Sequence, residues 1–428
     1  MNNIFRGELI SREELDNRIV ELGEILKNDV ILELDTHVVI DAVDKLVAGM
    51  NPLVLEGLLV SSGMTNWKAK DFIQTTMEGL SRESLTKKVH RELGEKPFIW
   101  REVEEGIEEK DQPFGVLMHI GAGNEIGLSV LSIIEGLLSG NINILKLPSY
   151  EGGISVLLLK QLVEIEPRLK PYIYVFDIAS YEKELLKKIA SLVDAIVVWG
   201  SDEAIAGVRQ LAHPSTSLIE WGHRISFAYF TQNESIKDDL KGLSLDICLS
   251  EQQYCSSPQC VFYETANNDE LEGFAYKLAK EIEETSKKYP TKQKPINTEA
   301  EITWTHELIK MEEILGQKRL ISNEEANYSV MVDYKPRLKA SPLYRNIWVM
   351  PIKRENLINI LRGHSGHLQT VGLSCEKEDA LEITRILYGA GVNRINPCGK
   401  MSKTYIGEPH DGFWTLRKYV RRVSRRTK

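Results

Sequence analysis

The sequence is poor in the residue patterns that mark disulfide-rich and zinc-binding proteins. It has five cysteines, at positions 248, 255, 260, 375 and 398, and none of them forms a CxxC pair. An odd number of irregularly spaced cysteines argues against a disulfide framework and favours a reducing compartment. No histidines cluster near them, so no metal site is predicted. Each cysteine is therefore expected to be core packing or a nucleophile.

Long apolar runs and an excess of positive charge are also missing. The most apolar stretch, residues 126–147, is interrupted by Glu135 and Lys146, so no membrane span is predicted. The net charge of −9 argues against general nucleic-acid binding, which needs a basic face. The N-terminal residues show no basic segment followed by an apolar run. No signal peptide is therefore expected, and a cytoplasmic location is the default.

Hydrophobic periodicity predicts an α/β fold. Apolar positions at helical spacing fill most of the first hundred residues, and a short strand is predicted at residues 98–100. From residue 113, strand-length apolar runs alternate with helical patterns, which indicates a doubly wound, Rossmann-like unit. The predicted strands are residues 115–120, 143–147, 172–176, 195–199 and 225–230, and the predicted helices are residues 128–138, 153–164, 182–191 and 202–211.

Domain boundaries follow from the same pattern. Residues 1–230 are predicted to form the helical region and the Rossmann-like cofactor-binding domain. Residues 231–396 are predicted to form a second α/β domain, which carries the nucleophile. Residues 397–428 form a basic tail, interpreted as a phosphate or acidic-partner contact, or preferably as a solvated terminal helix or a subunit contact.

The glycine-rich turn after the strand at 115–120 is a near match to a dinucleotide fingerprint. Gly121 and Gly123 are followed by Gly127, one position too late for G-x-G-x-x-G. Asn124 is more informative, because it lies at the carboxyl end of a strand, where ligand sites collect in open α/β sheets. The alternative is that Asn124 merely suits the turn.

Three further segments carry candidate chemistry. Cys255 precedes Ser-Ser-Pro turn residues and a strand, so its thiol can face a cleft, whereas Cys260 within that strand is expected to be buried. Glu220 ends an apolar strand and can act as a base; the alternative is a salt bridge to Arg224 or His223. Gly200 and Ser201 precede a helix, which suits either a phosphate or an ordinary N-cap by Ser201.

Together these segments resemble the aldehyde dehydrogenase superfamily from about residue 113 to residue 396. The run PFGVLMHIGAGN is similar to the superfamily's strand that ends in the oxyanion asparagine, here Asn124. GNINILKLPS, WGSDEAI, IEWGHRIS and QQYCSSPQ follow in the superfamily's order. Within it, CSSPQ, HIGAGN and GVNRINPCGK resemble the LuxC-like acyl-CoA reductases. The superfamily's Glu-Ile-Phe-Gly-Pro element is lacking, and LYRNIWVMPI stands near its expected place.

The resemblance implies reduction of an acyl thioester, from acyl-CoA or an acyl-protein, to an aldehyde. Cys255 would form an S-acyl intermediate, and Asn124 with the Cys255 backbone N–H would hold the oxyanion. Glu220 would help to set the protonation state of Cys255, with His223 ranked lower as a proton carrier. A homo-oligomer and an acyl-protein synthetase partner are further expectations from the family.

The resemblance also implies a nicotinamide cofactor. Lys146 and Ser149 would contact its adenine-side ribose, and Gly200 and Ser201 would face its pyrophosphate. Because Ser149 stands where NAD-preferring relatives often place a glutamate, a 2′-phosphate is accommodated, and NADPH is favoured over NADH. Glu151 is only two residues further on, so it can also be aligned with that glutamate.

Three other functions fit the sequence less well. The first is a CoA-acylating aldehyde dehydrogenase that oxidises small aldehydes with NAD. The second resembles glutamyl-phosphate reductase, which would need a cationic pocket for the departing phosphate. The third is an inactive scaffold for an acyl-protein synthetase, against which the retained Cys255, Asn124 and Glu220 argue.

Overall fold

The computed structural model describes residues 3–28, 33–61, 64–121, 127–148, 153–291, 294–323, 325 and 327–427. They fold into two compact units. The first unit combines Met1–Gly222 with Tyr405–Lys428, and the second is His223–Thr404. The domain boundaries expected after residues 230 and 396 stay predictions.

A mainly parallel sheet forms the centre of the first unit, with strand order β2-β1-β7-β6-β5-β8-β9. Its five parallel strands begin at β7, while β1 and β2 continue the sheet in antiparallel pairing. The chain runs from β5 to β6 and β7 on one side, and then to β8 and β9 on the other. This reversal is the topological switch of a doubly wound fold, whose ligand site lies at the carboxyl ends of the strands. The strands are β1 (Asn3–Phe5), β2 (Glu8–Ile10), β5 (Val116–Ile120), β6 (Ile142–Lys146), β7 (Ile173–Phe176), β8 (Ala195–Trp199) and β9 (Ser217–Trp221).

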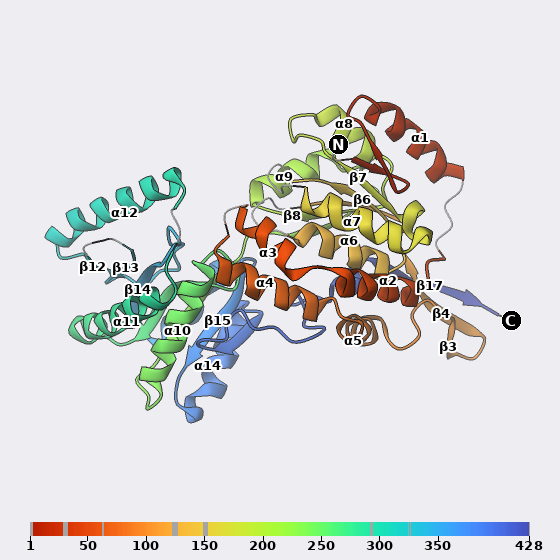
Figure 1. The fold of residues 1–428 in the computed structure, drawn as a ribbon. Helices are drawn as coiled ribbons and strands as arrows, with labels where there is room; N and C mark the ends of the chain where they lie inside the picture. Colours follow the sequence, from red (N-terminus) through yellow and green to blue (C-terminus); the bar gives the residue numbers. More distant parts are fainter. Residues whose placement is uncertain are drawn as a thin grey trace. The chain divides into compact units, whose positions relative to one another are not determined.

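Helices cover both faces of this sheet, as Figure 1 shows. Successive strand residues point to opposite faces, so Leu145 packs in one core and Ile144 in the other. One core includes helices α2 (Thr36–Gly49), α5 (Arg82–Leu93), α6 (Leu128–Leu138) and α7 (Ile154–Ile165), and the other includes α1 (Leu15–Asn28), α8 (Lys183–Ala190) and α9 (Asp202–Leu211). Helices α3 (Pro52–Ser61) and α4 (Asn66–Gly79) form a separate small apolar cluster with Ile154. The predicted doubly wound unit is confirmed.

A small antiparallel sheet, in the order β17-β4-β3, joins the end of the chain to the first unit. Its strands are β3 (Arg101–Glu104), β4 (Ile107–Pro113) and β17 (Val420–Arg426), and β17 follows the short helix α15 (Thr415–Lys418). The terminal helix considered for the basic run is therefore wrong, because residues 420–426 pair along β4. The strand predicted at residues 98–100 is also wrong: Phe98 has a left-handed φ of 68°, and the strand begins only at Arg101.

The second unit has its own mainly parallel sheet, with order β12-β13-β14-β11-β10-β15-β16. Only β12 runs antiparallel within it. The strands are β10 (Ile225–Phe230), β11 (Pro258–Glu264), β12 (Lys318–Ser322), β13 (Ser329–Asp333), β14 (Asn346–Ile352), β15 (Leu368–Ser374) and β16 (Arg394–Pro397). The prediction that residues 225–230 belong to the first sheet is wrong, because β10 pairs with β11 and β15.

Helices also cover both faces of the second sheet. Residues of α10 (Ile236–Ser250) and α11 (Asn268–Lys288) pack in one core. Residues of α12 (Ile296–Ile314), α13 (Leu357–Leu361) and α14 (Lys377–Ala390) pack in the other. In Figure 1 the labelled helices α10, α11, α12 and α14 lie beside the strands of their own unit. None of the helices in the described ranges combines the length and apolar character that crossing a membrane requires.

Candidate functional site

The carboxyl edge of the first sheet gathers several of the predicted site residues. In the register of the sheet, Lys146 on β6 lies opposite Ile120 on β5, Ile120 lies opposite Val198 on β8, and Val198 lies opposite Glu220 on β9. Lys146 ends its strand and is buried. Desolvation lowers the pKa of its ammonium group, while the charge of Asp177 acts in the opposite direction. Lys146 and Glu220 therefore share one edge of one sheet.

Gly200 and Ser201 connect β8 to α9 at the same edge. Ser201 is the N-cap of α9, and its Oγ accepts a hydrogen bond from the N–H of Ala204 at 3.3 Å. A Cβ atom at position 200 would lie 3.1 Å from the Cβ of Ala204, so the turn favours glycine. The N-cap interpretation of Ser201 is confirmed, and the helix N-terminus still presents its positive dipole end at the sheet edge.

Glu220 forms a two-pronged ion pair that sequence analysis did not foresee. Nε of Arg209 donates to its Oε1, and Nη2 of Arg209 donates to its Oε2, both at 2.6 Å. Arg209 lies on α9, eleven residues before Glu220. The salt bridge proposed as an alternative role therefore exists, with Arg209 as the partner. Pairing with Arg224 or His223, which belong to the second unit, stays a prediction.

An aromatic cluster, made of Trp199, Trp221 and His410, was missed by sequence analysis. The two indole rings stack with centroids 5.3 Å apart, and the imidazole meets them edge-on at 5.1 and 5.0 Å. Trp199 directly precedes Gly200, and Trp221 directly follows Glu220. The repeated Trp-Gly at the end of two successive strands was a signal for this cluster. Two other predicted residues, Asn124 and Ser149, lie outside the described part of the chain.

The nucleophile segment lies in the second unit, on a turn between α10 and the amino end of β11. Cys255 is exposed there. Its carbonyl accepts a hydrogen bond from Oγ of Ser226 at 2.6 Å. Oγ of Ser226 in turn accepts a hydrogen bond from the N–H of Thr370 at 3.0 Å. Oγ of Ser256 donates to Oγ of Ser402 at 3.0 Å. These contacts fix the turn to β10, to β15 and to the segment after β16.

The remaining cysteines differ from Cys255 in burial. Cys260 is fully buried in β11, as predicted, and desolvation raises the pKa of its thiol to about 12. Burial likewise raises the pKa of Cys248 to about 11 and places that of Cys398 well above its usual value. Cys375 is partly buried, with a pKa also raised mainly by desolvation. A thiolate at neutral pH is therefore disfavoured at these four positions.

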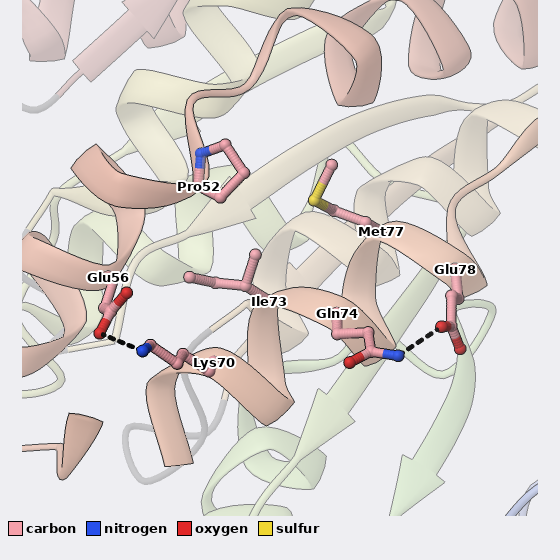
Figure 2. Close-up of a pocket in the computed structure, with 7 residues that line it drawn as sticks. All are labelled: Pro52, Glu56, Lys70, Ile73, Gln74, Met77 and Glu78. Atoms are coloured by element: carbon pink, nitrogen blue, oxygen red, sulfur yellow. Dashed lines mark hydrogen bonds and ion pairs between the residues drawn. The ribbon is translucent and has the colours of Figure 1, made fainter. Parts of the chain in front are cut away.

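A surface pocket of about 320 Å³ lies between α3 and α4. Figure 2 shows Ile73 and Met77 pointing toward Pro52, which gives the pocket an apolar centre. Charged and polar residues, paired as Glu56 with Lys70 and Gln74 with Glu78, form its rim (Figure 2). The predicted site residues that the structure describes do not line this pocket.

Comparison with known protein sequences identifies the chain's relatives. The family model described as acyl-CoA reductase (LuxC) matches residues 51–422. A long-chain acyl-protein thioester reductase of Aliivibrio fischeri is 25% identical over 319 residues, which cover 74% of this chain and 64% of that protein. The Vibrio harveyi protein of the same name is 24% identical over 73% of this chain and 64% of its own length. The chain thus matches less than two thirds of either relative.

Solved structures match the fold along almost the whole chain. An aldehyde dehydrogenase C variant from Pseudomonas syringae, solved with NAD⁺ and octanal, gives a TM-score of 0.73 at 14% identity, covering 100% of this chain and 93% of that one. The NADP-dependent glyceraldehyde-3-phosphate dehydrogenase of Bacillus halodurans, solved with NADP, gives 0.73 at 14% identity, with coverage of 99% and 98%. The predicted aldehyde dehydrogenase-like α/β fold is therefore confirmed. Because the family model covers most of its length, the chain belongs to the acyl-CoA reductase (LuxC) family.

Proposed function

We propose that the protein reduces an acyl thioester to an aldehyde through an S-acyl intermediate on Cys255. The observation that carries this proposal is the placement of Cys255: it is exposed on a turn anchored to neighbouring strands, while Cys248, Cys260 and Cys398 are buried. A nucleophile of this kind must be both accessible and held in place. Membership of the acyl-CoA reductase (LuxC) family supports the same chemistry.

The acyl donor is proposed to be a fatty acyl-CoA or an acyl-protein thioester. The relatives' name, long-chain acyl-protein thioester reductase, supports the second source, and the family description supports the first. An acyl-protein synthetase is the corresponding protein partner. The protein is further proposed to act as a homo-oligomer in the cytoplasm.

The reaction proceeds through bonds made and broken at Cys255. Its thiolate attacks the thioester carbonyl, and the oxyanion is held by the Asn124 amide and the Cys255 backbone N–H. The donor thiol leaves, so that the acyl group remains on Sγ. A reduced nicotinamide, which Lys146, Ser149, Gly200 and Ser201 would hold, would supply the hydride for the acyl carbon. Cleavage of the bond to Sγ then releases the aldehyde and restores the thiolate.

Glu220 is proposed to influence the protonation state of Cys255. Arg209 donates a hydrogen bond to each of its carboxylate oxygens, so removal of Arg209 changes the surroundings of this group without removing the carboxylate. His223 is the alternative proton carrier. Titration of the Cys255 thiol in Glu220→Gln and Arg209→Met tests the assignment, since a titration that matches wild type in both variants would exclude it.

The cofactor-binding residues are proposed to be Lys146, Ser149, Gly200 and Ser201. Lys146 fits an anionic or polyhydroxylic group, because a buried ammonium at a strand end gains from such a partner. The N-terminus of α9 fits a pyrophosphate. NADPH is favoured over NADH, in line with a solved neighbour that binds NADP, although another binds NAD⁺. Loss of the NADPH preference in Lys146→Met, measured by cofactor fluorescence titration, is the expected result.

Intact-protein mass spectrometry with acyl-CoA donors of several lengths tests the proposed function. Wild type is expected to gain one acyl mass, which disappears on addition of NADPH as aldehyde forms. Cys255→Ala is expected to gain none, while the matched control Cys375→Ala behaves as wild type. Acylation of Cys255→Ala at the wild-type rate would reject the nucleophile, and an unmodified wild-type protein with every donor would favour the scaffold.

A further inference from the structure

Two segments of left-handed backbone meet beside the Cys255 turn. Glu251 and Gln252, with φ of 54° and 59°, end α10 just before the turn. Leu343, Tyr344 and Arg345, with φ of 61°, 49° and 68°, lie directly before β14. None of the five is glycine, so each adopts a conformation that is unfavourable for its side chain. Such strain persists only where surrounding contacts over-determine the backbone.

A buried ion pair joins the two segments. Nη2 of Arg345 lies 2.9 Å from Oε1 of Glu251, and the two side chains are only 1% and 5% exposed. The same Nη2 donates to the carbonyl of Tyr289 at 2.5 Å, and Oγ1 of Thr291 donates to Oε1 of Glu251 at 3.0 Å. The backbones also meet, because the N–H of Tyr344 donates to the carbonyl of Glu251 at 3.0 Å.

The contacts of this ion pair are not those expected of one that serves only to stabilise the fold. Within the described residues, Oε2 of Glu251 and Nε of Arg345 are buried without a hydrogen-bond partner. Buried ion pairs of this kind are often no more stabilising than apolar residues of similar volume. A strained and incompletely satisfied cluster in a native protein calls for an explanation other than stability. Its position next to the nucleophile offers one.

Gln252 connects the Glu251–Arg345 cluster to the Cys255 turn through hydrogen bonds. Its Nε2 donates to the carbonyl of Pro258 at 2.9 Å and to the carbonyl of Asn346 at 3.2 Å. Residues 252 and 258 flank Cys255 on either side, so a single side chain ties both ends of the turn to the start of β14. Oγ of Ser250 and Oγ of Ser257 are a second pair across the turn, at 2.6 Å.

We propose that Glu251 and Arg345 are positioning residues for Cys255, which fix the nucleophile turn in the geometry that acyl transfer requires. This inference rests on the proposed role of Cys255. The pair acts through Gln252 and the backbone, not by contact with the acyl group. Attack on a bound carbonyl depends strongly on orientation, whereas alkylation by a small diffusing reagent does not.

The test compares these two reactions of the same sulfur. Glu251→Gln is expected to slow the transfer of an acyl group from acyl-CoA to Cys255 at least tenfold, as measured by quenched-flow mass spectrometry. Alkylation of Cys255 by iodoacetamide is expected to change less than threefold. The matched control Asp333→Asn removes another buried carboxylate of the same unit, paired with Arg337 at 2.6 Å, and is expected to leave both rates unchanged.

A second variant separates positioning from folding. Glu251→Gln combined with Arg345→Met removes both buried charges, so it is expected to recover the wild-type melting temperature. Acyl transfer in this double variant is expected to stay slow. Wild-type acyl transfer in either variant would overturn the inference while leaving the proposed function intact. A wild-type protein that accepts no acyl group would instead overturn the proposed function, and the positioning role with it.

Discussion

The stability of the second unit is expected to fall as pH rises through neutrality, because of one buried carboxyl group. Asp246 lies on α10 and accepts the N–H of Gly399 at 2.5 Å and that of Met401 at 3.1 Å. Desolvation raises its pKa from 3.8 to about 7 and outweighs these two hydrogen bonds. Cys398 interacts electrostatically with Asp246, but its thiol stays neutral around pH 7 because burial raises its pKa.

The sign and size of the effect follow from proton linkage. The folded state holds a proton on Asp246 between about pH 4 and pH 7, whereas the unfolded state does not. The contribution of Asp246 to stability is therefore complete below pH 4 and is lost as pH rises through about 7. Between pH 5 and pH 8 the loss amounts to about 2.5 kcal/mol, at about 1.36 kcal/mol for each unit of pKa difference.

Hydrogen exchange followed by mass spectrometry in a urea series measures this loss for the second unit alone. Peptides from β11 and β14 report its local unfolding free energy at pH 5, 6, 7 and 8. The unfolding free energy of wild type, relative to that of Asp246→Asn, is expected to fall by about 2.5 kcal/mol across that range, because the neutral Asn side chain does not titrate. Asp238→Asn, an exposed change on the same helix, is expected to show no such trend. A difference that is constant with pH would refute the claim that burial outweighs the two N–H donors.

Three further predictions concern the first unit. Gly136→Ala is expected to cost about 3 kcal/mol, because the new Cβ would lie 1.8 Å from Oδ1 of the buried Asn143, and thermal unfolding measures this loss. Lys88→Met is expected to cost about 3–5 kcal/mol, because it leaves two buried carboxylates without their cation; urea unfolding, with Lys87→Met as the exposed control, measures it. Arg425→Ala is expected to cost less than about 1 kcal/mol, because its ion pair on β17 is half exposed. The melting temperature of this variant, measured with and without added salt, tests the prediction, and no change with salt is expected.

Buried parallel strands were predictable from the sequence because both of their faces are apolar. Residues 195–199, predicted from their apolar run, have the same bounds as β8. The strands of the small sheet were not predictable. β4 is charged and only partly buried, and its ladder partner β17 lies some three hundred residues later in the chain. Local patterns carry no information about that pairing.

The carboxyl edge of the first sheet was also predictable, since strand order alone places Lys146, Gly200, Ser201 and Glu220 there. What the sequence concealed is the partner of Glu220. Identifying Arg209 requires knowing which side of α9 faces β9, and the charge pattern of neighbouring residues pointed to Arg224 and His223 instead. The roles of Asn124 and Ser149 stay predictions.

The nucleophile turn shows why the remaining part of the site was out of reach. Local rules assign left-handed backbone to glycine or asparagine, so Glu251, Gln252, Leu343, Tyr344 and Arg345 give no sign of it. Their conformation is maintained by contacts between segments 94 residues apart, which no local window contains. The conflict between local preference and the folded backbone is itself informative, because evolved sequences avoid such conflicts except where function requires them. Two described cysteines lie near this conflict: Cys248 is buried, whereas Cys255 is exposed, and this combination of exposure and a fixed turn favours a positioned nucleophile over an incidental surface thiol.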